Sequence, residues 1–204
     1  MSNKKLLIYI STILASLIPC PGRFAFGILL VIIFNIIFLL AVLINHLFTI
    51  LEINEFSKFL MPVAICSLVM LFYQFLVFFS PILAIQLSFI LYIQAFSIYL
   101  MFFMFDDDNV LPLKEDIHNQ LYKCFWYSSL TLCFTLIREV LGYGCISFPS
   151  FSGLYPIYIF NISSLTFMNF FASIPGATII CAFAISILLH FNSLKSLKKG
   201  ESNE

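Results

Sequence analysis

The sequence has few charged residues. Only 10% of its 204 residues are Asp, Glu, Lys or Arg, and ten basic and ten acidic side chains give a formal net charge of zero. Soluble domains contain about 25% charged residues, so this chain lacks the surface composition of a soluble protein. It also lacks the excess of basic residues that binds phosphate backbones, so we expect no nucleic-acid partner.

The sequence also lacks the short motifs that carry common chemistry. Its six cysteines form no CxxC pair, and most lie in apolar runs, where a thiol behaves as a small hydrophobic group. We therefore expect no disulfide framework. No glycine-rich phosphate loop and no nucleophile elbow is present, so nothing predicts nucleotide binding or hydrolysis by this chain. The three histidines (His46, His118 and His190) are not clustered and do not suggest a shared metal site.

Long hydrophobic runs fill most of the chain. Hydrophobic residues make up 62% of the sequence, and 26 residues are phenylalanine. A soluble fold of this length could not bury so much apolar surface. We therefore expect an all-α polytopic membrane protein, with residues 1–204 forming one integral domain in the lipid bilayer.

About six of these runs are candidates for membrane spans. The expected spans are residues 6–18, 24–44, 59–79, 82–105, 121–141 and 175–191. The first is short, since it reaches only about 20 Å against a hydrocarbon core about 30 Å thick. Residues 154–171 form a seventh apolar stretch. Lysines at both chain ends favour the cytoplasm and an even number of crossings, so we expect this stretch to be a partly buried or interfacial connection.

Six spans divide into two inverted repeats of three, approximately residues 6–79 and 82–191. Each repeat is expected to begin with a broken helix: Pro19 and Pro21 end the first segment, and Gln94 and Ser97 interrupt the second with polar groups. Paired irregular segments in inverted repeats mark binding sites near the membrane midplane. This pattern directs attention to Cys20 in the first repeat and to residues 94–97 in the second.

An arginine and a glutamate follow the fifth apolar run. Arg138 is one of two arginines in the chain, and Glu139 is its neighbour. Charged groups at membrane depth usually face the interior of a helix bundle or a polar cavity, because contact with lipid is costly. We expect the pair to face a partner helix or a cavity. The alternative is that the pair marks the water interface.

Residues 106–120 form the most hydrophilic loop and are expected in water on the cytoplasmic side. The loop begins with three aspartates, Asp106 to Asp108. Successive residues point in different directions, so a solvated turn is favoured over a metal site.

Three segments resemble a known family. They are Cys20-Pro21 after the short first run, residues 134–139 leading to Gly142-Tyr143-Gly144, and residues 173–177 (Ser-Ile-Pro-Gly-Ala) opening the last run. Together they resemble the small six-helix subunits of the Rnf and Nqr complexes, of the D/E type. The resemblance implies a bacterial inner-membrane complex that couples electron transfer among NADH, ferredoxin or quinone to sodium or proton translocation. It implies that this chain is a non-catalytic or electron-relay subunit beside other Rnf/Nqr-like subunits.

The resemblance also implies a cofactor. In that family, two homologous subunits form an antiparallel pair, and each contributes two cysteines to a shared [2Fe–2S] cluster. Cys20 occupies the first cysteine position, whereas Ser97 stands at the second. The resemblance therefore implies a degenerate iron–sulfur site with Cys20 and Ser97 as its ligands from this chain. The alternatives on the same fold are a non-redox small transporter or channel, or a structural subunit.

Overall fold

A computed structural model describes residues 3–105, 113–150, 153–159 and 168–201 of the chain. The elements are α1 (Asn3–Leu17), α2 (Phe24–Ile50), α3 (Asn54–Phe79), α4 (Pro81–Phe105), α5 (Leu113–Tyr143), β1 (Cys145–Ser150), β2 (Gly153–Tyr158), α6 (Asn169–Ala172) and α7 (Ile174–Glu201). The protein is mostly helical, as the hydrophobic runs predict.

Three helices in the described residues are long and apolar enough to cross a membrane. These segments are Phe24–Ile50 of α2, Phe59–Phe79 of α3 and Pro81–Met101 of α4, and α7 contains the shorter apolar segment Ile174–Ile187. They indicate a membrane protein. The count of six spans and the inverted repeats stay predictions.

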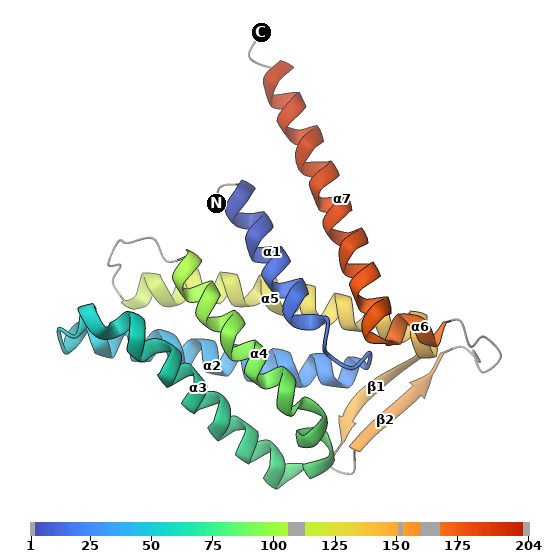
Figure 1. Ribbon diagram of the computed structural model, residues 1–204, viewed down its shortest axis with the longest axis horizontal. Coiled ribbons are helices and arrows are strands. Elements are labelled where there is room, and N and C mark those ends of the chain that lie inside the picture. Colours follow the sequence, from blue (N-terminus) through green and yellow to red (C-terminus); the bar gives the residue numbers. More distant parts are fainter. Residues whose placement is uncertain (1–2, 106–112, 151–152, 160–167, 202–204) are drawn as a thin grey trace.

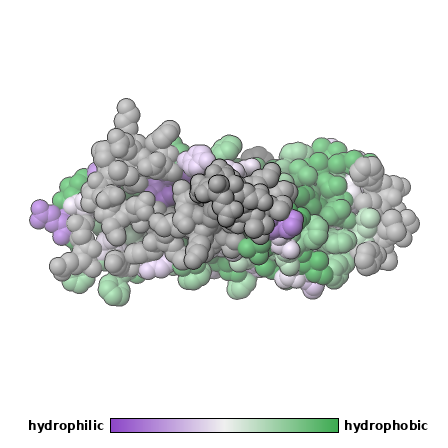
Figure 2. Space-filling model, turned by 90° about the horizontal axis from the view of Figure 1, so that it is seen from above, coloured by the Kyte–Doolittle hydropathy of each residue, from purple (hydrophilic) through white to green (hydrophobic). Residues whose placement is uncertain are grey.

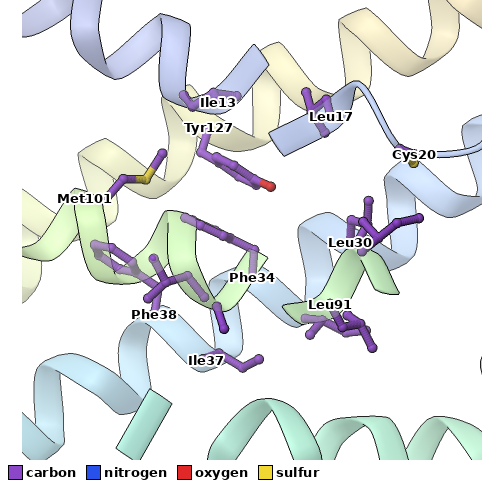
Figure 3. Packing of buried hydrophobic residues seen from close by; sticks show 14 of the residues in the cluster. Ile13, Leu17, Cys20, Leu30, Phe34, Ile37, Phe38, Leu91, Met101 and Tyr127 are labelled. Atoms are coloured by element: carbon purple, nitrogen blue, oxygen red, sulfur yellow. The ribbon is translucent and has the colours of Figure 1, made fainter. Parts of the chain in front are cut away.

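Two long helices form the centre of the molecule. Figure 1 shows α2 and α5 side by side and running in opposite directions, with α1 and α4 crossing them and α7 extending away from the rest. α4 also packs along α3. In the core, the rings of Phe34 and Tyr127 stack with centroids 3.5 Å apart, so that α2 and α5 are in direct contact (Figure 3).

A β-hairpin follows α5 and was not expected from the sequence. β1 and β2 pair antiparallel, with Cys145 opposite Tyr158 and Ser150 opposite Gly153. α5 ends at Tyr143, and Gly144 follows with φ of 62°, the left-handed conformation that favours glycine after a helix. The expected connection over residues 154–171 is thus partly a strand, and residues 160–167 lie outside the described residues.

Three expected boundaries were wrong. Residues 45–58, which lie between the second and third expected spans, are helical except for residues 51–53, where the chain turns with Glu52 at φ of 59°. Residues 113–120, expected as part of a water-exposed loop, belong to α5, while Asp106 to Asp108 lie outside the described residues. The last helix begins at Ile174 and continues to Glu201, beyond the expected end at residue 191.

The expected interruption of the second repeat's first helix was also wrong, since α4 is continuous. Its polar side chains hydrogen-bond without disturbing the helix. Ser97 Oγ donates to Ile93 O at 3.1 Å, and Gln94 Nε2 donates to Leu30 O at 2.9 Å. A polar residue in an apolar helix needs a partner, and a carbonyl can supply one without breaking the backbone.

Large apolar side chains remain exposed on α3, α4 and α7. Examples are Phe59 and Phe78 on α3, Phe89 and Phe96 on α4, and Phe183 on α7. Figure 2 shows that apolar residues dominate much of one face outside the grey part. Exposed apolar surface of this extent suits lipid or a partner subunit.

Candidate functional site

Two interruptions of the chain meet near the C-terminal end of α5. The first break comprises residues 18–23, between α1 and α2, and the second break is Ser173, between α6 and α7. Proline and glycine explain the first break, since Pro19, Pro21 and Gly22 follow one another closely. At the second break, Ser173 is extended, with ψ of 166°, and Pro175 follows in the first turn of α7.

Arg138 on α5 joins the two breaks. Its side chain is completely buried, and Nη1 donates to Cys20 O at 2.7 Å and to Leu17 O at 3.4 Å. Nη2 donates to Ala172 O at 2.9 Å and to Ser173 O at 3.3 Å. A single guanidinium therefore holds the carbonyl ends of two segments that lie more than 100 residues apart in the chain.

Glu139 is equally buried but holds a different set of groups. Its Oε2 accepts hydrogen bonds from Phe24 N at 2.8 Å and from Ser147 N at 2.9 Å. Phe24 N is the first amide of α2, so the carboxylate lies where the helix end carries partial positive charge. The two adjacent side chains therefore bind different backbone groups, since Arg138 binds carbonyls and Glu139 binds amides.

Arg23 lies on the outer side of the Glu139 carboxylate. Its Nη1 lies 3.7 Å from Glu139 Oε1, and its guanidinium carbon lies 4.1 Å from the centre of the Tyr143 ring. The Cys145 thiol donates to the same Oε1 at 3.6 Å. Burial raises the pKa of the Cys145 thiol, and the Glu139 carboxylate raises it further, so the thiol stays protonated at neutral pH.

Small residues allow the close approach at the breaks. A Cβ at Gly22 would come within 2.6 Å of Ala172 O, and a Cβ at Gly142 would come within 2.6 Å of Ala172 Cβ. Ala172 is therefore packed between the first break and α5. Larger residues at either glycine would push α6 away from Arg138.

The structure agrees with the expectation that Arg138 and Glu139 lie inside protein, since neither side chain is exposed. Cys20 and Ser97, the other two expected site residues, are also buried, but the groups around each of them are different. Cys20 lies in the first break, where burial raises the pKa of its thiol to about 12 against the opposing effect of Arg138. Ser97 lies within α4 and bonds to its own helix.

These residues do not fit a [2Fe–2S] cluster by themselves. Such clusters need four cysteine ligands or close substitutes, and this chain supplies one thiol at the two expected positions. Among the described residues, no three His, Cys, Asp or Glu side chains form a group able to hold a metal ion. The Ser97 hydroxyl is committed to Ile93 O, as a helical serine commonly is.

A polar contact in the core was not anticipated from the sequence. Gln94 Nε2 donates to the Tyr127 hydroxyl at 3.3 Å as well as to Leu30 O, and thereby links α4, α5 and α2. Gln94 and Tyr127 have less than 4% of their surface exposed. The signal in the sequence was Gln94 itself, but nothing there identified Tyr127 as its partner.

Comparisons of the chain with protein-family models, with curated proteins and with solved structures found no match.

Proposed function

We propose that the chain is a membrane subunit of an Rnf/Nqr-like complex that couples electron transfer to sodium or proton translocation in a bacterial inner membrane. One observation supports this proposal above the others. The three segments that carry the resemblance lie at one site, because Arg138 bonds to the carbonyls of Cys20 and Ser173. A resemblance spread over distant segments is more informative when those segments are in contact.

The role of this chain's own residues in that complex is architectural. Arg138 and Glu139 fix the first and second breaks, and the exposed apolar faces of α3, α4 and α7 are available to lipid and to a homologous subunit. We derive no electron-transfer step through this chain, because its residues supply only one of the two expected thiols.

A second candidate is a non-redox subunit on the same fold, either structural or a small transporter or channel. The observation that favours it is the state of Ser97, whose hydroxyl donates to Ile93 O within α4. A side chain satisfied in this way has no need of a metal.

Purification of the tagged chain from native membranes in a mild detergent tests the complex. The expected result is that a homologous membrane subunit and flavin-binding and NADH-binding subunits are identified with it by mass spectrometry. Recovery of the chain without any such partner, under conditions that preserve other membrane complexes, would contradict the proposal.

Iron content tests the degenerate iron–sulfur site, and bound iron that depends on Cys20 would exclude the non-redox candidate. We expect little or no iron and a weak or absent [2Fe–2S] signal by electron paramagnetic resonance after reduction, with any iron lost in Cys20→Ser. A Ser97→Cys variant restores the second expected thiol and should raise the iron content if the resemblance places the ligands correctly. A full cluster signal that survives Cys20→Ser would show that the assignment of ligands is wrong.

A further inference from the structure

The positive charge of Arg138 is balanced in an unusual way. Among the described residues, no carboxylate forms an ion pair with it, and the carboxylate of Glu139 is directed to Arg23 and to the start of α2. The acceptors around the guanidinium are four backbone carbonyls, which we call the carbonyl cradle: those of Leu17, Cys20, Ala172 and Ser173. A buried charge needs such compensation, because its transfer out of water is very costly.

The carbonyl cradle has the chemistry of a cation site. α1 ends at Leu17 and α6 ends at Ala172, so that two of the four carbonyls belong to helix ends. Leu17 O also accepts a hydrogen bond from Cys20 N at 3.1 Å and Ser173 O one from Ala177 N at 3.0 Å, and each carbonyl oxygen has a second lone pair for the guanidinium. The C-terminal end of α1 also carries partial negative charge. In membrane transporters, carbonyls of unwound segments and helix C-terminal ends coordinate monovalent cations such as Na⁺.

Two further contacts favour a cation over a neutral donor. The guanidinium carbon of Arg138 lies 5.6 Å from the centre of the Phe134 ring, within the range of a cation–π interaction. Its shortest hydrogen bonds, 2.7 Å and 2.9 Å, have the lengths typical of charge-assisted bonds. The cradle therefore surrounds the charge with oxygen dipoles and one aromatic ring.

We propose that the carbonyl cradle is a monovalent-cation site that Arg138 occupies as a tethered cation. The guanidinium joins the first and second breaks and leaves no place for an exchangeable ion between them. This proposal does not depend on electron transfer, and its test uses the purified full chain, so it can fail or succeed separately from the proposed complex.

Chemical rescue of Arg138→Ala tests the site. The variant should melt at a lower temperature than the wild type in detergent, and methylguanidinium at millimolar concentration should raise its Tm in a saturable way. At a concentration tenfold above Kd, we expect a rise of roughly 3 to 6 °C. Methylurea, the neutral analogue of similar shape, should have no such effect, and the wild type should respond to neither compound.

Two comparisons make the rescue specific. Na⁺ and K⁺ should stabilise Arg138→Ala more than N-methylglucamine, a much larger cation, at the same ionic strength. Phe134→Ala creates a cavity on the same helix without removing a charge, so methylguanidinium should not stabilise it. The proposal is overturned if methylurea rescues as well as methylguanidinium, or if Phe134→Ala responds as strongly as Arg138→Ala.

A second pair of variants decides the question if Arg138→Ala does not fold. Arg138→Lys keeps a cation, whereas Arg138→Gln keeps hydrogen-bond donors without a charge. The yield of monodisperse protein by size-exclusion chromatography should be clearly higher for Arg138→Lys. An equal or higher yield for Arg138→Gln would show that the cradle does not require a cation.

Discussion

The first and second breaks are stabilised in different ways. At the first break, α2 begins at Phe24 without a side-chain cap of its own, and its first amides are bound by Glu139 and Ser147 from distant parts of the chain. At the second break, Ser173 caps α7 locally, since its hydroxyl accepts a hydrogen bond from Gly176 N at 3.4 Å. Both breaks then present their carbonyls to Arg138.

The difference shows which break depends on tertiary structure. A serine followed by a helix carries its own capping group, so the second break can form from local sequence alone. The first break has no such group and needs α5 and the hairpin in place. Changes on α5 should therefore disturb the first break most, whereas changes at Ser173 should remain local.

The largest effect is expected for Glu139→Ala. The change leaves the amides of Phe24 and Ser147 without an acceptor, at a cost of about 2 to 6 kcal/mol, and the loss of the ion pair with the partly exposed Arg23 adds little. Thermal unfolding in detergent, followed by intrinsic fluorescence, should show a large fall in Tm. Glu139→Gln keeps one acceptor oxygen, so its Tm should lie between those of Glu139→Ala and the wild type.

Gln86→Ala is the control for this prediction, because Gln86 is an exposed polar residue on α4. It should leave Tm nearly unchanged. A similar Tm for Glu139→Ala and Gln86→Ala would mean that the first break does not need its distant cap.

An intermediate effect is expected for larger residues around Ala172. Gly142→Ala places a Cβ 2.6 Å from Ala172 Cβ, and overpacking of this kind costs about 1 to 3 kcal/mol. Ala172→Gly removes the opposing methyl group, so the double variant should recover part of the loss. Gly22→Ala meets the backbone O and Cα of Ala172 at 2.6 Å and 2.7 Å and its Cβ only at 3.0 Å, so Ala172→Gly should relieve it much less.

A double-mutant cycle on Tm measures this difference. The expected interaction is favourable for Gly142→Ala with Ala172→Gly and clearly smaller for Gly22→Ala with Ala172→Gly. Equal interaction in both pairs would mean that α6 shifts as a whole and that the two contacts are not separate.

The sequence predicted a mostly helical chain with apolar helices long enough to cross a membrane, and it favoured burial of Arg138 and Glu139 over a place at the water interface, because charges beside an apolar run have few favourable places in a bilayer. It did not predict what Arg138 binds. Backbone carbonyls are its acceptors, and every residue has one, so Ala172 and Ser173 carry no signature of this role. Likewise, nothing in the sequence distinguished Ser147 from other loop serines, because it is the hairpin that brings its backbone amide to Glu139.

The errors have a common physical origin. Gln94 and Ser97 were expected to interrupt their helix, but a buried polar side chain can hydrogen-bond to a carbonyl on its own or a neighbouring helix and leave the backbone intact. The hairpin was missed because Pro149 and Pro156 are poor strand residues in a central sheet. In a two-stranded hairpin each strand has an open edge, where proline is tolerated.

The smallest effect is expected for Ser173→Ala, and it tests the local nature of the second break. Loss of an N-cap costs about 1 kcal/mol, and the 3.4 Å bond to Gly176 N suggests a value at or below that figure. Ser173→Thr keeps the hydroxyl and should behave like the wild type. Hydrogen exchange should quicken at residues 174, 176 and 177 in Ser173→Ala and stay unchanged at residues 24–26, because Glu139 and Ser147 still cap α2. Faster exchange at the first residues of both α2 and α7 would show that the two breaks open together through Arg138. The local cap of α7 would then also support the first break.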